Sequence, residues 1–212
     1  PRLKGSLMLD RHLHPRIKPA LNRLVSALDK PGITPDGLTL AGFAIGLLTL
    51  PFLALGWYPA ALVAIVLNRL LDGLDGALAR RRGLTDAGGF LDIALDFLFY
   101  ALVPFGFALA APEQNTLAAA WLLFAFIGTG SSFLAFAALA AKHNIDNPGY
   151  AHKSFYYIGG LTEGTETIAL FVLCCLFPAH FALFAWVFGA LCWLTTTTRI
   201  WSGYVTLKSL NP

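Results

Sequence analysis

Charged side chains are scarce in this sequence. Asp, Glu, Lys and Arg make up 13% of the 212 residues, whereas a soluble domain has about 25%. A disordered chain is therefore excluded, and a net charge of +3 is too small to indicate a nucleic acid as partner. Because 57% of the side chains are apolar, an ordinary soluble enzyme is excluded as well. The composition predicts a polytopic membrane protein with a single domain.

Cysteine and methionine are also rare. The three cysteines, Cys174, Cys175 and Cys192, lie in apolar runs without a CxxC or Cys/His spacing, which predicts buried free thiols rather than disulfides or a metal site. Met8 is the only methionine, so we expect residues 1–7 to be a remnant of a fusion. Residues 8–212 are then expected to form one membrane domain.

The apolar residues predict an all-α fold. Between residues 13 and 30, apolar positions recur at helical spacing among basic ones, which predicts an amphipathic helix at the membrane interface. Spans of about 20 apolar residues cross a bilayer. Six such transmembrane helices are expected, at about 38–56, 59–79, 89–111, 116–141, 162–180 and 181–207.

Lysine and arginine lie on one side of these spans. They occur before the first span, in the loops after the second and fourth spans, and after the last span, while the opposite loops near Trp57, Glu113 and Ala179 have none. Positively charged loops stay in the cytoplasm. Both termini are therefore expected to be cytoplasmic, which agrees with an even number of spans.

Four aspartates lie near the cytoplasmic ends of the second and third spans. Asp72 and Asp75 are three residues apart and Asp92 and Asp96 are four apart, so each pair shares one face of its helix. Ionisable residues in a membrane span are expensive and indicate function. Four converging carboxylates need a cation, and oxygen ligands favour a hard one such as Mg²⁺ or Mn²⁺.

Glycines and an arginine surround these aspartates. Gly73 and Gly76 leave room for a ligand beside the second span, Arg80 can neutralise a phosphate, and Gly88 opens the start of the third span. The combination predicts metal-assisted phosphoryl transfer on a pyrophosphate-bearing substrate. The alternative is a cation-coupled carrier, but carrier sites usually lie near the middle of the bilayer.

The stretch from Asp72 to Asp96 resembles the signature of the CDP-alcohol phosphotransferase family, D-x2-D-G-x2-A-R-x8-G-x3-D-x3-D. Its conserved letters correspond here to Asp72, Asp75, Gly76, Ala79, Arg80, Gly88, Asp92 and Asp96. Seven residues instead of the usual eight follow Arg80, which indicates a tighter turn. Thr34 to Thr39 also resembles the family's T-P-N-x-L-T, with Asp36 in place of Asn.

The resemblance implies a small bacterial inner-membrane enzyme with its active site on the cytoplasmic side. Such an enzyme transfers a phosphoalcohol group from a CDP-alcohol, often CDP-diacylglycerol, to an acceptor hydroxyl and releases CMP in phospholipid biosynthesis. Asp72, Asp75 and Asp92 would hold divalent metal, and Asp96 would be the general base and could also ligate a second metal ion. Gly76, Ala79 and Arg80 would contact the CDP moiety. A homodimer surrounded by membrane lipids is expected. A non-catalytic family member is the remaining alternative.

A second polar cluster marks a possible acceptor site. Lys153 precedes the fifth span, Glu163 and Glu166 lie at its start, and Arg199 interrupts the sixth. Lys153 and Arg199 would suit an acceptor phosphate or carboxylate, and the two glutamates a polyol or amine. Alternatively, these groups pair with one another and stabilise the bundle. Arg69, three residues before Asp72, is expected to be a structural counter-ion of the acidic cluster; the alternative is contact with a lipid phosphate.

Overall fold

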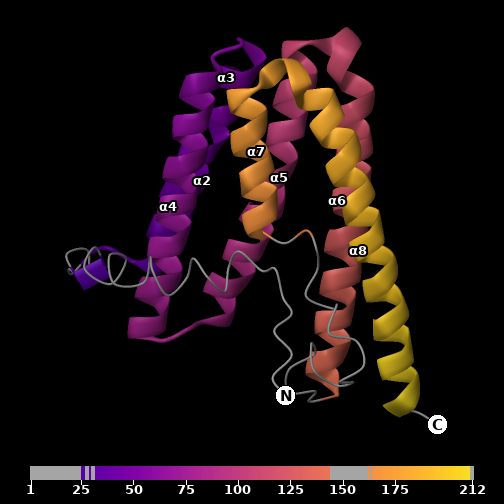
Figure 1. The fold of residues 1–212 in the computed structure, drawn as a ribbon. Coiled ribbons are helices and arrows are strands. Elements are labelled where there is room, and N and C mark those ends of the chain that lie inside the picture. The colour runs from indigo at the N-terminus through magenta and orange to yellow at the C-terminus, as the bar shows by residue number, and fades with distance from the viewer. Residues whose placement is uncertain (1–24, 27–28, 30–31, 144–161, 163, 211–212) are drawn as a thin grey trace, which may run out of the picture.

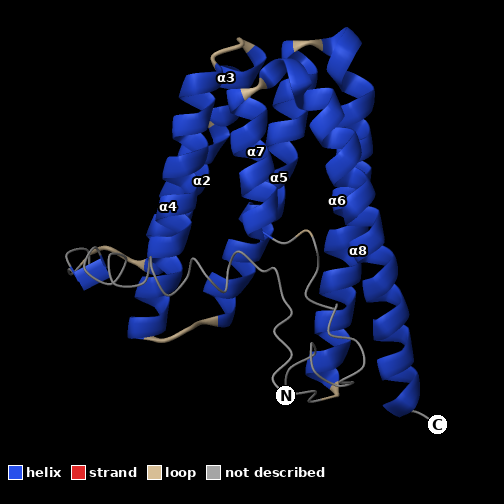
Figure 2. Ribbon diagram, in the orientation of Figure 1, coloured by secondary structure: helices blue, strands red, loops and turns tan. Residues whose placement is uncertain are grey.

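The structure is a computed structural model that describes residues 25–26, 29, 32–143, 162 and 164–210. Every regular element in these ranges is helical (Figure 2), as the sequence predicted for an all-α protein. The expected fusion remnant and most of the amphipathic helix lie outside the described residues. Val25 and Ser26 are helical, and Val25 is fully buried against Leu74 and Leu78, which lie on the helix that carries Asp72 and Asp75.

The first expected span consists of two helices, α2 (Pro35–Leu47) and α3 (Thr49–Ala54). Thr34 caps α2, since its hydroxyl accepts a hydrogen bond of 3.0 Å from the Gly37 backbone N–H. The break after Leu47 lies four residues before Pro51, which has no N–H to donate to the Leu47 carbonyl. The interruption of this span therefore has a local cause in the sequence.

The chain then passes up and down through a bundle of long helices (Figure 1). These are α4 (Tyr58–Arg82), α5 (Asp86–Ala110), α6 (Pro112–Lys142), α7 (Gly164–Leu176), the short 3-10 helix η1 (Pro178–His180) and α8 (Phe181–Leu210). The basic ends of α4, α6 and α8 lie at the same end of the bundle, the lower one in Figure 1.

The described helices correspond to the six expected spans. Four segments are long and apolar enough to cross a membrane: Pro35–Ala54, Asp86–Ala110, Pro112–Lys142 and Pro178–Ser209. The fifth differs from expectation at its end, because α7 stops at Leu176. Its described part, Gly164–Leu176, has 13 residues, a length of about 20 Å. Crossing of the membrane by α4 and α7 stays a prediction.

Aromatic side chains form the centre of the bundle. Phe99, Phe107, Phe171 and Phe181 are almost fully buried, and the rings of Phe107 and Phe181 stack with their centroids 4.4 Å apart. Around this core α2 packs along α4 and α5, α6 packs along α8, and α7 packs against α4. The three cysteines are buried and free, as predicted. This packing fixes the facing sides of α2, α4 and α5, where the polar residues gather.

Candidate functional site

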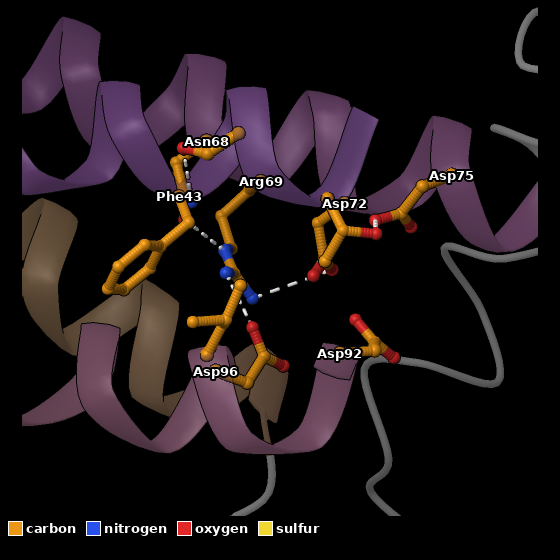
Figure 3. Close-up of a pocket in the computed structure, with 10 residues that line it drawn as sticks. Phe43, Asn68, Arg69, Asp72, Asp75, Asp92 and Asp96 are labelled. Carbon is orange, nitrogen blue, oxygen red and sulfur yellow. Dashed lines mark hydrogen bonds and ion pairs between the residues drawn. The ribbon is translucent and has the colours of Figure 1, made fainter. Parts of the chain in front are cut away.

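A polar pocket lies between α2, α4 and α5, and all four signature aspartates line it (Figure 3). Asp72 and Asp75 come from α4, and Asp92 and Asp96 reach towards them from α5. The spacing of each pair places its two aspartates on one face of its helix, and α4 and α5, which both pack against α2, run in opposite directions from the turn that joins them (Figure 1). The remaining residues that line the pocket are Thr39, Gly42, Phe43, Asn68, Arg69 and Leu95.

Three of the four carboxylates lie close enough to share one ion. One oxygen from each of Asp72, Asp92 and Asp96 lies within 4.8 Å of the others. Two oxygens on opposite sides of one Mg²⁺ are about 4.2 Å apart, and those around Ca²⁺ are up to about 5.2 Å apart. Small side-chain adjustments therefore bring this set onto a divalent ion, and its all-oxygen chemistry fits a hard cation.

Asp75 is held separately, by the first helix. The hydroxyl of Thr39 on α2 donates a hydrogen bond of 2.5 Å to Asp75 Oδ2. Asp75 is almost completely buried, at 4% exposure, so this bond compensates part of the cost of removing the carboxylate from water. Thr39 therefore fixes the side chain of Asp75 at the edge of the pocket.

Arg69 is the positive charge among the residues that line the pocket. Its guanidinium donates to Asp96 Oδ1 over 2.7 Å and lies 3.5 Å from Asp72 Oδ2. Its Nε donates to Asn68 Oδ1 over 2.8 Å. The expected counter-ion is thus found in contact with one aspartate from each pair (Figure 3).

The residues expected to contact CDP lie further along α4. Gly76, Ala79 and Arg80 follow the two α4 aspartates towards the basic end of the helix and do not line the polar pocket. A Cβ on Gly76 would lie 3.4 Å from the guanidinium of Arg80, so the glycine leaves space beside that arginine. The structure places these residues next to the aspartates, on the side away from Arg69.

The structure describes two of the four expected acceptor residues, and neither of these two lines the pocket. Lys153 and Glu163 lie outside the described residues. Glu166 is in the first turn of α7, and Arg199 on α8 donates a hydrogen bond of 3.0 Å to the Thr129 carbonyl of α6. Neither Glu166 nor Arg199 lines the pocket between α2, α4 and α5.

Two polar residues of the site, Thr39 and Asn68, have contacts that were not predicted from the sequence. Asn68 is buried, and its amide donates to the Gly42 carbonyl on α2 over 2.9 Å while its oxygen accepts from Arg69. A signal for Asn68 was available, since an amide inside an apolar span needs a partner. Thr39 ends the T-P-D-G-L-T stretch, but only the packing of α2 on α4 shows that it contacts Asp75.

The chain matches a protein family and several known proteins. A family model described as CDP-alcohol phosphatidyltransferase matches residues 32–201. The chain is 86% identical over 204 residues to the inner membrane protein YnjF of Escherichia coli (strain K12), covering 96% of this chain and 99% of that protein. It is 41% identical over 98 residues to archaetidylinositol phosphate synthase of Pyrococcus horikoshii, covering 46% of this chain and 52% of the relative.

A solved structure shares the fold. The crystal structure of Mycobacterium tuberculosis phosphatidylinositol phosphate synthase with CDP-DAG bound superposes with a TM-score of 0.64 at 20% sequence identity. The superposition covers 87% of this chain and 93% of that one. The arrangement of helices around the pocket is therefore that of a known membrane fold.

Proposed function

Since the chain belongs to the CDP-alcohol phosphatidyltransferase family, we propose that it transfers a phosphatidyl group from CDP-diacylglycerol to an acceptor hydroxyl and releases CMP. The observation that carries the proposal is the convergence of Asp72, Asp75, Asp92 and Asp96 on one pocket. The bound CDP-DAG of the Mycobacterium tuberculosis protein supports the choice of a lipid donor. The reaction belongs to phospholipid biosynthesis.

We propose that the aspartates bind Mg²⁺ or Mn²⁺. Asp72, Asp92 and Asp96 would share one ion, and Asp75 would complete the metal site from its position beside Thr39. When bound, the divalent cation neutralises the charge on the donor pyrophosphate and favours departure of CMP. The role of the protein is to hold the four carboxylates in place before the donor arrives.

The transfer itself needs one proton acceptor. The acceptor oxygen forms a bond to the phosphorus that carries diacylglycerol, and the bond from that phosphorus to the bridging oxygen breaks, so that CMP leaves with this oxygen. Asp96 takes the proton of the acceptor hydroxyl. Because Oδ1 of Asp96 accepts a hydrogen bond from Arg69, the proton goes to its second oxygen, Oδ2.

The two ends of the substrate site are proposed from the sequence pattern. Gly76, Ala79 and Arg80 would contact the CDP moiety, because they lie beyond the metal aspartates on α4. The acceptor alcohol is proposed to be bound by Lys153, Glu163, Glu166 and Arg199. A cytoplasmic orientation of both termini and the active site is supported by the common location of the basic helix ends, and a homodimer remains a proposal.

The relative in Escherichia coli is named an inner membrane protein. Together with the four described segments that are apolar and long enough to cross a bilayer, this name supports the inner membrane as the location of the chain. We propose residues 8–212 as the single catalytic membrane domain.

The test is release of CMP from CDP-diacylglycerol by the purified protein with a panel of acceptor alcohols. Loss of a general base lowers the rate by about 10²-fold or more, so Asp96→Asn is expected to do so with the matching acceptor. Asp86→Asn is the matched control, because Asp86 lies in the first turn of the same helix and outside the pocket. Absence of CMP with every acceptor would show a non-catalytic family member.

A further inference from the structure

We propose that the guanidinium of Arg69 is held among the aspartates and competes with a divalent metal ion for the same carboxylates. Metal would then bind weakly to the protein alone and tightly only together with the pyrophosphate of the donor. The inference rests on the proposed metal-dependent function, and it assigns to Arg69 the coupling between metal and nucleotide binding.

The contacts of Arg69 carry the first step. Its Nη2 lies 2.7 Å from Asp96 Oδ1 and its Nη1 lies 3.5 Å from Asp72 Oδ2. Asp72 and Asp96 are two of the three residues whose oxygens come within 4.8 Å of one another. The guanidinium is therefore bound to the same carboxylates that would ligate the metal, and not to a separate surface group.

Arg69 is also fixed in this position. Its Nε is held by Asn68, and its Cζ lies 4.8 Å from the ring centroid of Phe99 and 5.6 Å from that of Tyr100. The side chain is only 17% exposed, and arginine keeps its charge at every accessible pH. The site thus contains a permanent charge of +1 even when no metal is bound.

This charge has two opposing effects on a metal ion. Arginine orients the carboxylates, and loss of such an outer partner commonly weakens metal binding about 10- to 100-fold. Against this, Arg69 repels a divalent ion a few ångströms away and must give up part of its attraction to Asp72 and Asp96. We expect repulsion to dominate, because the helices that carry Asp72 and Asp96 are both held by packing against α2 and not by Arg69 alone.

A bound nucleotide changes the balance. The pyrophosphate of the donor adds negative charge beside the aspartates and offsets the charge of Arg69. Metal and nucleotide are then expected to strengthen each other's binding, and by linkage the effect is equal in both directions. Removal of the arginine should weaken this coupling as well as tighten metal binding to the protein alone.

The experiment measures Mn²⁺ binding by electron paramagnetic resonance of the free ion, with the full-length protein in lipid nanodiscs, without and with CDP. Arg69→Met removes the charge but keeps an extended apolar side chain against Phe99 and Tyr100. Without CDP this variant is expected to bind Mn²⁺ about tenfold more tightly than the unaltered protein. CDP should then tighten Mn²⁺ binding less in the variant than in the unaltered protein.

Two controls separate charge from geometry. Arg69→Lys keeps the charge and loses the forked hydrogen bonds, so its Mn²⁺ affinity should stay within about threefold of the original if charge decides. Arg82→Gln removes an arginine of the same helix, thirteen residues or about 20 Å away, and should leave the affinity unchanged. Arg69→Gln repeats the test if the Met variant does not fold.

The results that would overturn the inference are distinct from those that concern the function. The role of Arg69 alone is overturned if the unaltered protein binds Mn²⁺ in the presence of CDP but both neutral Arg69 variants bind Mn²⁺ no more tightly than the unaltered protein does. Absence of Mn²⁺ binding in every variant, with or without CDP, overturns the proposed metal site and the inference together.

Discussion

The hydrogen bond between Thr39 and Asp75 gives the most direct test of how α2 serves the site. Thr39→Val replaces the hydroxyl by a methyl group of similar size, so the packing of α2 against α4 is retained. The change removes a donor 2.5 Å from a buried carboxylate. Hydrogen bonds to charged groups contribute about 1.5–3 kcal/mol. If that contribution persists in the transition state, kcat/KM falls about 10- to 150-fold.

The assay is the initial rate of CMP release from CDP-diacylglycerol as a function of Mn²⁺ concentration. Because Asp75 is a proposed metal ligand, Thr39→Val is expected to raise the Mn²⁺ concentration needed for half-maximal rate as well as to lower the rate. A role confined to stability would lower the melting temperature without changing this metal dependence.

The chain offers a matched control in Thr116→Val. Both hydroxyls lie near the carbonyl of a proline four residues earlier, at 3.1 Å from Pro35 for Thr39 and 2.6 Å from Pro112 for Thr116. The single hydroxyl proton of Thr39 goes to Asp75, whereas that of Thr116 goes to the Pro112 carbonyl. Thr116 is exposed and lies near the start of α6, at the end of the bundle opposite the basic helix ends (Figure 1). Equal activity and equal Mn²⁺ dependence of the two variants would refute the role assigned to Thr39.

Three further measurements test the packing and the metal. Gly106→Ala would place a Cβ 2.8 Å from Leu53 and is expected to lower the unfolding free energy by about 1–3 kcal/mol. The control is Gly89→Ala, whose Cβ would meet no atom within 4 Å and should not lower it. Equal melting temperatures of the two variants would contradict this packing. Arg82→Ala breaks a partly exposed ion pair of 2.6 Å with Asp29 and should lower the free energy of unfolding by no more than about 1 kcal/mol. A larger loss of stability would contradict this, if it is recovered in a double variant that reverses the charges of both residues. Chelation with EDTA is expected to abolish CMP release until Mg²⁺ or Mn²⁺ is returned, and activity that persists in chelator would contradict the metal site.

The fold was predictable because it depends on apolar length and charge placement. The apolar runs gave the order and approximate bounds of the helices, and the spacing of the four aspartates predicted that they converge. The end of α7 at Leu176 was not predictable, since the apolar run continues through Phe177, Pro178 and beyond. Hydropathy does not show that the helix ends at Leu176 and that a turn follows.

The contacts within the site were only partly predictable. A counter-ion role for Arg69 follows from its position one turn before Asp72. Its pairing with Asp96 on the other helix depends on the rotation of α4 against α5, and a sequence does not specify that rotation. The same holds for Thr39 and Asn68, whose partners are supplied by helix packing between distant segments. Arg199 contacts Thr129 for the same reason.

The link between α4 and α5 has a consequence for how the signature tolerates length changes. Arg81 and Arg82 still belong to α4, and Asp86 already belongs to α5, so only residues 83–85 join the helices. Gly83 turns there with a φ of +107°, and Thr85 starts α5 by accepting a hydrogen bond from the Gly88 N–H. The spacings that orient the aspartates are internal to each helix. A connection one residue shorter than in the family signature would therefore leave the angular phase of each pair unchanged, and an extra glycine inserted after Gly83 should leave all four carboxylates facing the pocket.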